Sequence, residues 1–168
     1  MIATIETQLI DLLPRLRRYA ISLSRMADVA DELVQSACER ALAAHESQSE
    51  TLRFDAWMFR IVRNLWYDRL RRQRSRGEEI EIGSRDDLVV VEGEAIPERR
   101  MLLAKAAAAI DRLPEDQREL LLLICVEDVS YREAAEILEI PLGTVMSRLA
   151  RARKRVAEDV GVESGRVL

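Results

Sequence analysis

Hydrophobic side chains recur every three or four residues along most of the chain, which is the period of an amphipathic α-helix. The first such segment covers residues 11–24. Its apolar positions are Leu12, Leu16, Tyr19 and Leu23. We expect a helix here with Pro14 in its first turn, where the missing proline N–H does no harm.

The second helix is predicted over residues 28–44 and has two contrasting faces. Its apolar face consists of Leu33, Val34, Ala37, Ala41 and Ala44. A polar face without lysine carries Asp28, Asp31, Glu32, Gln35 and Glu39. Such a face is either a solvated helix surface or a docking surface for a basic partner, and the charges alone favour the solvated surface.

The third predicted helix begins near Phe54 and combines an apolar side with a basic stripe. The expected apolar side is Phe54, Trp57, Met58, Ile61, Val62 and Leu65. The opposite stripe is Arg60, Arg63, Tyr67 and Arg71. Residues 53–76 carry a local charge of +6, which indicates contact with a polyanion. We expect Phe59 and Trp66 to pack in the core rather than stack on bases.

The second half of the chain predicts four helices, the last two joined by a tight turn. The first covers residues 98–113, and Pro114 opens the next, through Val126. Ser130 and Glu133 have the spacing of a capping box, which starts a short helix over residues 131–138. A basic helix follows over residues 143–156, and the pair describes a helix-turn-helix.

The basic helix separates its side chains by face. Its apolar stripe is Val145, Leu149, Ala152 and Val156. Opposite stand Ser147, Ala150, Arg151 and Lys154, with Thr144, Arg148 and Arg155 on one edge and Met146 and Arg153 on the other. Arginines beside small residues fit a major-groove reader, because an arginine donates two hydrogen bonds to guanine. The alternative is a solvated basic helix.

Charge and composition divide the chain further and limit its chemistry. The 168 residues carry a net charge of −4, distributed as +3 over residues 1–76, −6 over 77–97 and −1 over 98–168. We expect an acidic flexible linker, 77–97, between two small helical domains, with a brief strand possible at Val89–Val91. One histidine and two cysteines make a Cys/His zinc site, a disulfide framework and an enzyme improbable.

The first 76 residues contain no glycine and so no Gly-rich phosphate loop, and the chain has no P-loop. No cofactor, metal site or catalytic residue is predicted. The chain also lacks a signal peptide and a long apolar run, and we expect a cytoplasmic protein without membrane contact of its own. Cys38 is expected to be a packed thiol rather than a redox sensor.

Three segments resemble the extracytoplasmic-function (ECF) group of bacterial sigma factors. Residues 30–35 are similar to region 2.2, with the order of its two acids exchanged. Residues 54–72 resemble regions 2.3 and 2.4, and residues 113–153 resemble region 4.2. The resemblance spans about residues 9–76 and 98–157, in the family's order.

The resemblance implies an all-α protein that gives RNA polymerase its promoter specificity. Region 2.2 would bind the β′ clamp helices of core polymerase through Asp31, Glu32 and Gln35, which favours the docking surface over the solvated one. The −10 promoter element would be contacted by Arg60, Arg63, Asn64, Tyr67 and Arg71, with Asn64 at a flipped-base pocket. The −35 element would be read by Thr144, Ser147, Arg148, Ala150, Arg151, Arg153 and Lys154. Further implied partners are the β flap and an anti-sigma factor.

Three departures from the family's pattern qualify these expectations. The candidate −10 loop, residues 45–50, lacks aromatic and glycine residues. Met146 stands where relatives often have a basic residue. Glu139 stands where glycine is common, and a left-handed backbone there costs about 1 kcal/mol.

Two other functions remain open from the sequence. A sigma mimic would titrate an anti-sigma factor without binding core polymerase, although the intact basic helix and the absence of a receiver segment count against it. A stand-alone helix-turn-helix regulator would bind duplex DNA tightly without polymerase.

Overall fold

The computed structural model describes residues 4–44, 53–80 and 97–161, and all regular structure within these ranges is α-helical. The contacts divide the chain into two units, residues 1–88 and 89–168. The division falls inside the segment 77–97. The predicted all-α architecture of two small helical domains is therefore confirmed, whereas the loop 45–50 and the strand at Val89–Val91 lie outside the described residues.

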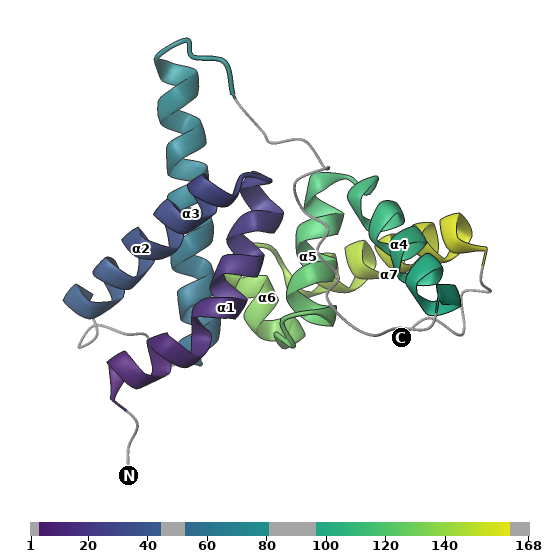
Figure 1. Ribbon diagram of the computed structural model, residues 1–168, viewed down its shortest axis with the longest axis horizontal. Helices are drawn as coiled ribbons and strands as arrows, with labels where there is room; N and C mark the ends of the chain where they lie inside the picture. Colours follow the sequence, from purple (N-terminus) through teal and green to yellow (C-terminus); the bar gives the residue numbers. More distant parts are fainter. Residues whose placement is uncertain (1–3, 45–52, 81–96, 162–168) are drawn as a thin grey trace. The chain divides into compact units, whose positions relative to one another are not determined.

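The first unit is built from α1 (Ile5–Ser24), α2 (Ala27–Ala44) and α3 (Phe54–Ser75). Each of the three packs on the other two, and α3 extends beyond α1 and α2 at its C-terminal end (Figure 1). The largest fully buried side chains of this unit include Leu16, Tyr19, Phe59 and Trp66. The rings of Tyr19 and Phe59 meet edge to face with centroids 5.2 Å apart, which joins α1 to α3.

The start of α1 differs from the prediction. The helix begins at Ile5 rather than near Asp11, and the Thr4 hydroxyl caps it by accepting a hydrogen bond from the Thr7 N–H at 3.4 Å. Pro14 therefore lies inside the helix and not in its first turn. It lies on the exposed side, where water can satisfy the carbonyl that proline leaves without a donor.

The buried face of α3 also differs from the expected one. Phe59 and Trp66 are buried, as predicted, with exposed fractions of 0% and 2%. In contrast, Phe54, Trp57 and Ile61 are only half-buried. Because α3 packs on α1 and α2 at once, its buried surface is wider than a single apolar stripe and is centred between Phe59 and Val62.

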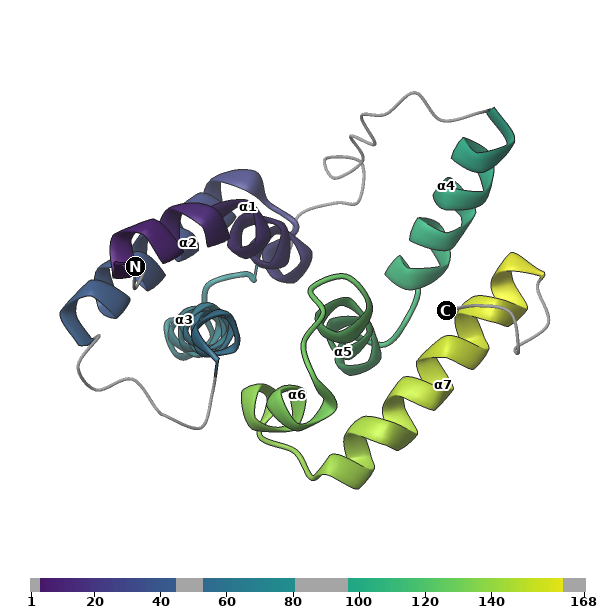
Figure 2. The same ribbon diagram turned by 90° about the horizontal axis from the view of Figure 1, so that it is seen from below.

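The second unit contains α4 (Pro97–Asp111), α5 (Glu115–Cys125), α6 (Tyr131–Leu138) and α7 (Leu142–Val160). All four predicted helices are confirmed, with α7 longer than expected at both ends. In this unit α7 packs against α4, α5 and α6 (Figure 2). The predicted stripe of α7 supplies its contacts, because Val145, Leu149, Ala152 and Val156 are all buried.

The two ends of α6 have the predicted local chemistry. The Ser130 hydroxyl accepts a hydrogen bond from the Glu133 N–H at 3.1 Å, and the Glu133 carboxylate accepts one from the Ser130 N–H at 3.1 Å. The capping box is thus confirmed. Glu139 ends α6 with φ 55° and ψ 44°. This is the left-handed region, in which a residue other than glycine costs about 1 kcal/mol of stability.

This geometry predicts that Glu139→Gly stabilises the protein. Glycine adopts the left-handed conformation without the side-chain clash, so the free energy of unfolding should rise by about 1 kcal/mol. Urea denaturation followed by circular dichroism measures the change. Glu136→Gly in the middle of α6 is the matched control and should lower stability by a similar amount, about 1 kcal/mol. Equal destabilisation by the two substitutions would contradict the prediction.

Candidate partner and nucleic-acid interfaces

The acidic face of α2 is exposed and partly paired by arginines from the neighbouring helices. Asp31 accepts a hydrogen bond from Arg17 Nε of α1 at 2.7 Å, and Glu32 accepts one from Arg69 of α3 at 2.7 Å. The Asp31 and Glu32 side chains nevertheless remain 58% and 64% exposed. Gln35 is exposed and donates a hydrogen bond to Glu39 at 3.1 Å. The three predicted polymerase-binding residues therefore lie together on one accessible surface.

An apolar groove runs between α1 and α2 directly beside this surface. It has a volume of about 580 Å³. Its apolar lining consists of Leu9, Ile10, Leu13, Val34, Cys38 and Leu42, and Asp31, Gln35, Arg17, Glu6 and Glu39 form its polar border. Ile10, Leu13 and Leu42 are 66%, 38% and 45% exposed. The groove thus offers apolar contact area next to the predicted polar contacts, as protein interfaces commonly do.

Cys38 lies in the wall of this groove. Burial, and to a lesser extent the negative charge of Glu39, raise the pKa of its thiol. A raised pKa leaves less thiolate at neutral pH, and the thiolate is the reactive form. This environment favours the expected packed thiol over a redox sensor.

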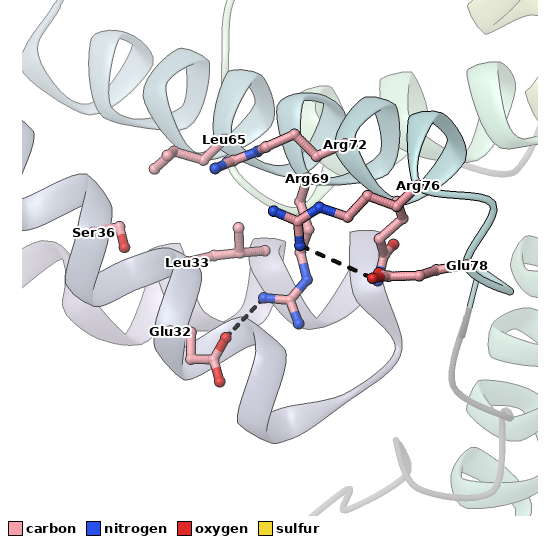
Figure 3. Close-up of a pocket in the computed structure, with 9 residues that line it drawn as sticks. Glu32, Leu33, Ser36, Leu65, Arg69, Arg72, Arg76 and Glu78 are labelled. Atoms are coloured by element: carbon pink, nitrogen blue, oxygen red, sulfur yellow. Dashed lines mark hydrogen bonds and ion pairs between the residues drawn. The ribbon is translucent and has the colours of Figure 1, made fainter.

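A second hollow, with a volume of about 300 Å³, lies between α2 and the C-terminal part of α3. Figure 3 shows the Arg69 side chain reaching from α3 to Glu32, and Arg76 paired with Glu78 at 3.9 Å. The apolar side chains of Leu33 and Leu65 also line this hollow. The hollow joins the acidic face of α2 to the arginine-rich end of α3.

The predicted −10 residues occupy the side of α3 away from the core. Arg60, Arg63, Asn64 and Tyr67 are half-buried and Arg71 is exposed. The Arg63 guanidinium lies over the Tyr67 ring, 4.5 Å from its centroid, and Arg71 pairs with Asp68 at 2.6 Å. The stacked pair presents a cation and an aromatic surface together, a combination suited to nucleic acid.

The predicted −35 residues divide into an outward group and a half-buried group. Ser147, Ala150, Arg151 and Lys154 are exposed on α7. The Arg151 Nε donates to the Ser147 carbonyl at 3.3 Å, and Lys154 pairs with Glu158 at 3.9 Å. These four residues form the accessible face that a major groove would contact.

The half-buried group consists of Thr144, Arg148 and Arg153. Arg148 pairs with Asp116 of α5 at 3.3 Å. Arg153 approaches the Cys125 sulfur at 3.9 Å, so part of this guanidinium faces α5 and not solvent. Arg148 and Arg153 are therefore less accessible than Arg151, which is exposed.

Several interface residues were not found from the sequence. Ile10 lies before the predicted helix start at Asp11, and Leu13 lies outside the predicted apolar stripe of that helix. The partners Arg17, Arg69 and Asp116 come from other helices, and no local spacing signals such tertiary pairs. A full-length α1 pattern, beginning at the Thr4 cap, would have revealed the exposed apolar positions of the groove.

The described residues offer neither a metal site nor a membrane-spanning helix. In residues 4–44, 53–80 and 97–161, His, Cys, Asp and Glu side chains form no cluster of three or more that could hold a metal ion. None of the helices there is long and apolar enough to cross a membrane.

Fold and surface define an all-helical protein of two domains, one of which carries a helix-turn-helix with an outward basic face. The family description "Sigma-70 region 2" matches residues 9–76, and "Sigma-70, region 4" matches residues 103–156. The ECF RNA polymerase sigma factor EcfG of Rhodopseudomonas palustris is 38% identical over 144 residues, which cover 86% of this chain and 78% of that relative. The chain belongs to the ECF family of RNA polymerase sigma factors.

Other relatives extend the comparison. SigM of Mycobacterium tuberculosis, also an ECF RNA polymerase sigma factor, is 33% identical over 88% of this chain and 72% of its own length. The sigma factor RpoE of Bartonella quintana, solved in complex with the anti-sigma factor NepR, has a TM-score of 0.75 and 34% identity, covering 94% of this chain and 97% of that one. The PhyRSL–NepR complex of Sphingomonas sp. Fr1 contains a chain that shares the fold at a TM-score of 0.69 and 22% identity.

Proposed function

We propose that this sigma factor binds core RNA polymerase and directs it to promoters with particular −10 and −35 elements. It supplies DNA recognition and works in the cytoplasm, whereas the polymerase performs nucleotidyl transfer, so the chain itself is not an enzyme. The observation that carries this proposal is the coexistence, in an acidic chain, of an exposed acidic face on α2 and an exposed basic face on α7. A stand-alone DNA-binding protein does not need the first face.

The acidic face of α2 suits contact with polymerase. Asp31, Glu32 and Gln35 present two carboxylates and an amide beside an apolar groove. In our proposal these residues bind the β′ clamp helices, and the second unit contacts the β flap. Carboxylates on an exposed surface also steer a basic partner before contact.

The basic faces of α3 and α7 are assigned to DNA. We assign Arg60, Arg63, Asn64, Tyr67 and Arg71 to the −10 element, and Thr144, Ser147, Arg148, Ala150, Arg151, Arg153 and Lys154 to the −35 element. The boundaries 1–76, 77–97 and 98–168 are our proposed domain limits, with the acidic linker between the two contacts. Joining two weak contacts in one chain raises the effective concentration of the second.

Regulation by an anti-sigma factor is part of the proposal. The Bartonella quintana relative was solved with such a factor, and it is similar along nearly its whole length. A protein that covers the α2 surface would exclude polymerase from it. A sigma mimic would bind the anti-sigma factor equally well, so binding to core polymerase distinguishes the two functions.

Run-off transcription tests the proposed function directly. Core polymerase from the same bacterium, supplied with this protein and a library of genomic fragments, should start RNA at defined sites that are silent with core polymerase alone. Matching −10 and −35 sequences should precede these start sites. If the start sites are the same with and without the protein, the proposal is wrong.

The double variant Asp31→Asn with Glu32→Gln should bind core polymerase about 10-fold or more weakly, because two charge-assisted contacts are lost. The dissociation constant is measured by fluorescence anisotropy of the labelled chain at two salt concentrations. Asp11→Asn, an exposed acid on α1, is the matched control and should bind like the unaltered protein. Thermal melting must change little, since exposed ion pairs contribute only about 0–1 kcal/mol to stability. Wild-type affinity in the double variant would contradict the assignment.

Arg151→Ala should weaken recognition of the −35 element by about 1–3 kcal/mol if Arg151 contacts a base edge. Holoenzyme binding is measured on the preferred −35 sequence and on a set of single-base substitutions. A base contact predicts loss of discrimination at one position. Uniform weakening on every sequence would instead assign Arg151 to a phosphate.

A further inference from the structure

Asp116 joins the first turn of α5 to the basic helix α7 by an ion pair. Its Oδ2 atom lies 3.3 Å from Nε of Arg148, and the two side chains are 49% and 29% exposed. The two helices pack against each other, so this pair connects elements whose relative position the core fixes. Arg148 is thereby the predicted −35 residue that is paired with a carboxylate from another helix.

The position of Asp116 determines which N–H donors of Arg148 remain available for hydrogen bonds to DNA. A guanidinium carries five N–H donors in a rigid planar fork, and the shortest contact with Asp116, at 3.3 Å, is made by Nε. In the described ranges, no residue makes a hydrogen bond with the Nη1 and Nη2 atoms of Arg148. These two nitrogens form the edge that donates to guanine O6 and N7.

In the part of the chain that the structure describes, the neighbours of Asp116 and Arg148 do not form an equivalent ion pair between α5 and α7. Glu115 lies beside Asp116 in the same first turn, yet within residues 4–44, 53–80 and 97–161 it forms no ion pair. Among the described residues, Arg151 is bonded within its own helix, through the Ser147 carbonyl. Asp116 therefore restrains, from outside α7, one half-buried arginine at the edge of the exposed basic face of that helix.

Such a restraint has an energetic consequence for DNA recognition. A long arginine side chain loses rotamer freedom when it binds a base, and a partner that orients it beforehand reduces this loss. The same carboxylate repels DNA phosphates, so it weakens sequence-independent attraction. Orientation and repulsion together favour discrimination between sequences over bare affinity.

We infer that Asp116 is a positioning residue that orients Arg148 to read one base pair of the −35 element. This inference rests on the proposed function of the protein as a sigma factor and adds a specificity determinant outside the recognition helix. Asp116 itself does not contact the base.

The test uses the full-length protein in holoenzyme with core polymerase. A selection from random −35 sequences with the unaltered protein defines the preferred element and its single-base variants. Binding to this set is then compared for Asp116→Asn, Arg148→Ala and the double variant. Glu115→Gln is the matched control, since it removes the same charge from the adjacent position.

Asp116→Asn should reduce the preference at one base pair by about three- to fivefold, the size expected of an exposed ion pair. Arg148→Ala should reduce the preference at the same base pair by about 10-fold or more. Adding Asp116→Asn to Arg148→Ala should have no further effect there. Binding of Asp116→Asn to unrelated DNA should stay equal or increase, which a loss of folding would not produce.

Several results would overturn the inference. These are an equal loss on all sequences, an Asp116→Asn effect that persists without the arginine, and an Arg148→Ala variant with normal discrimination. In each of these cases the unaltered protein still directs transcription, so the proposed function stands. If the unaltered protein gives no promoter-dependent transcription, the proposed function and this inference fail together.

Discussion

Burial of the apolar stripe on α7 is the interaction on which the second unit depends. Val145, Leu149 and Ala152 are 0–2% exposed against α4, α5 and α6. Because a helix has only one rotation that buries this stripe, the same packing directs Ser147 and Arg151 outward. Fold and recognition face are therefore consequences of one pattern of apolar positions.

This coupling explains why much of the protein was predictable from its sequence. The helix-turn-helix depends on local signals, such as the Ser130 capping box and the left-handed Glu139, and both occur as the sequence indicates. The start of α1 was predicted wrongly, because Pro14 suggested that the helix begins near Asp11, whereas it begins at Ile5. Proline on an exposed side costs less than the burial of Leu9 and Leu12 gains.

The arginines that pair with the acidic face of α2 could not be predicted from the sequence, because they come from other helices. Arg17 with Asp31, and Arg69 with Glu32, pair side chains from different helices, and these distances exist only after the bundle has formed. Exposed pairs of this kind add little stability, about 0–1 kcal/mol each. Their value is geometric, since they restrict the rotamers of carboxylates that the proposed function requires to face polymerase. The residues of the α2 face were predictable, but their orientation was not.

Charge placement unites the two units under the proposed function. The chain is acidic as a whole, with a net charge of −4, although residues 53–76 carry +6. Free protein therefore gains little from general attraction to DNA, because the −6 charge of residues 77–97 opposes the phosphates. In the proposed function, binding to polymerase would bring both basic faces to DNA at once, so that the second contact becomes intramolecular. Under the proposed function, weak affinity of the free protein for DNA is therefore expected, because promoter recognition then depends on assembly with the polymerase.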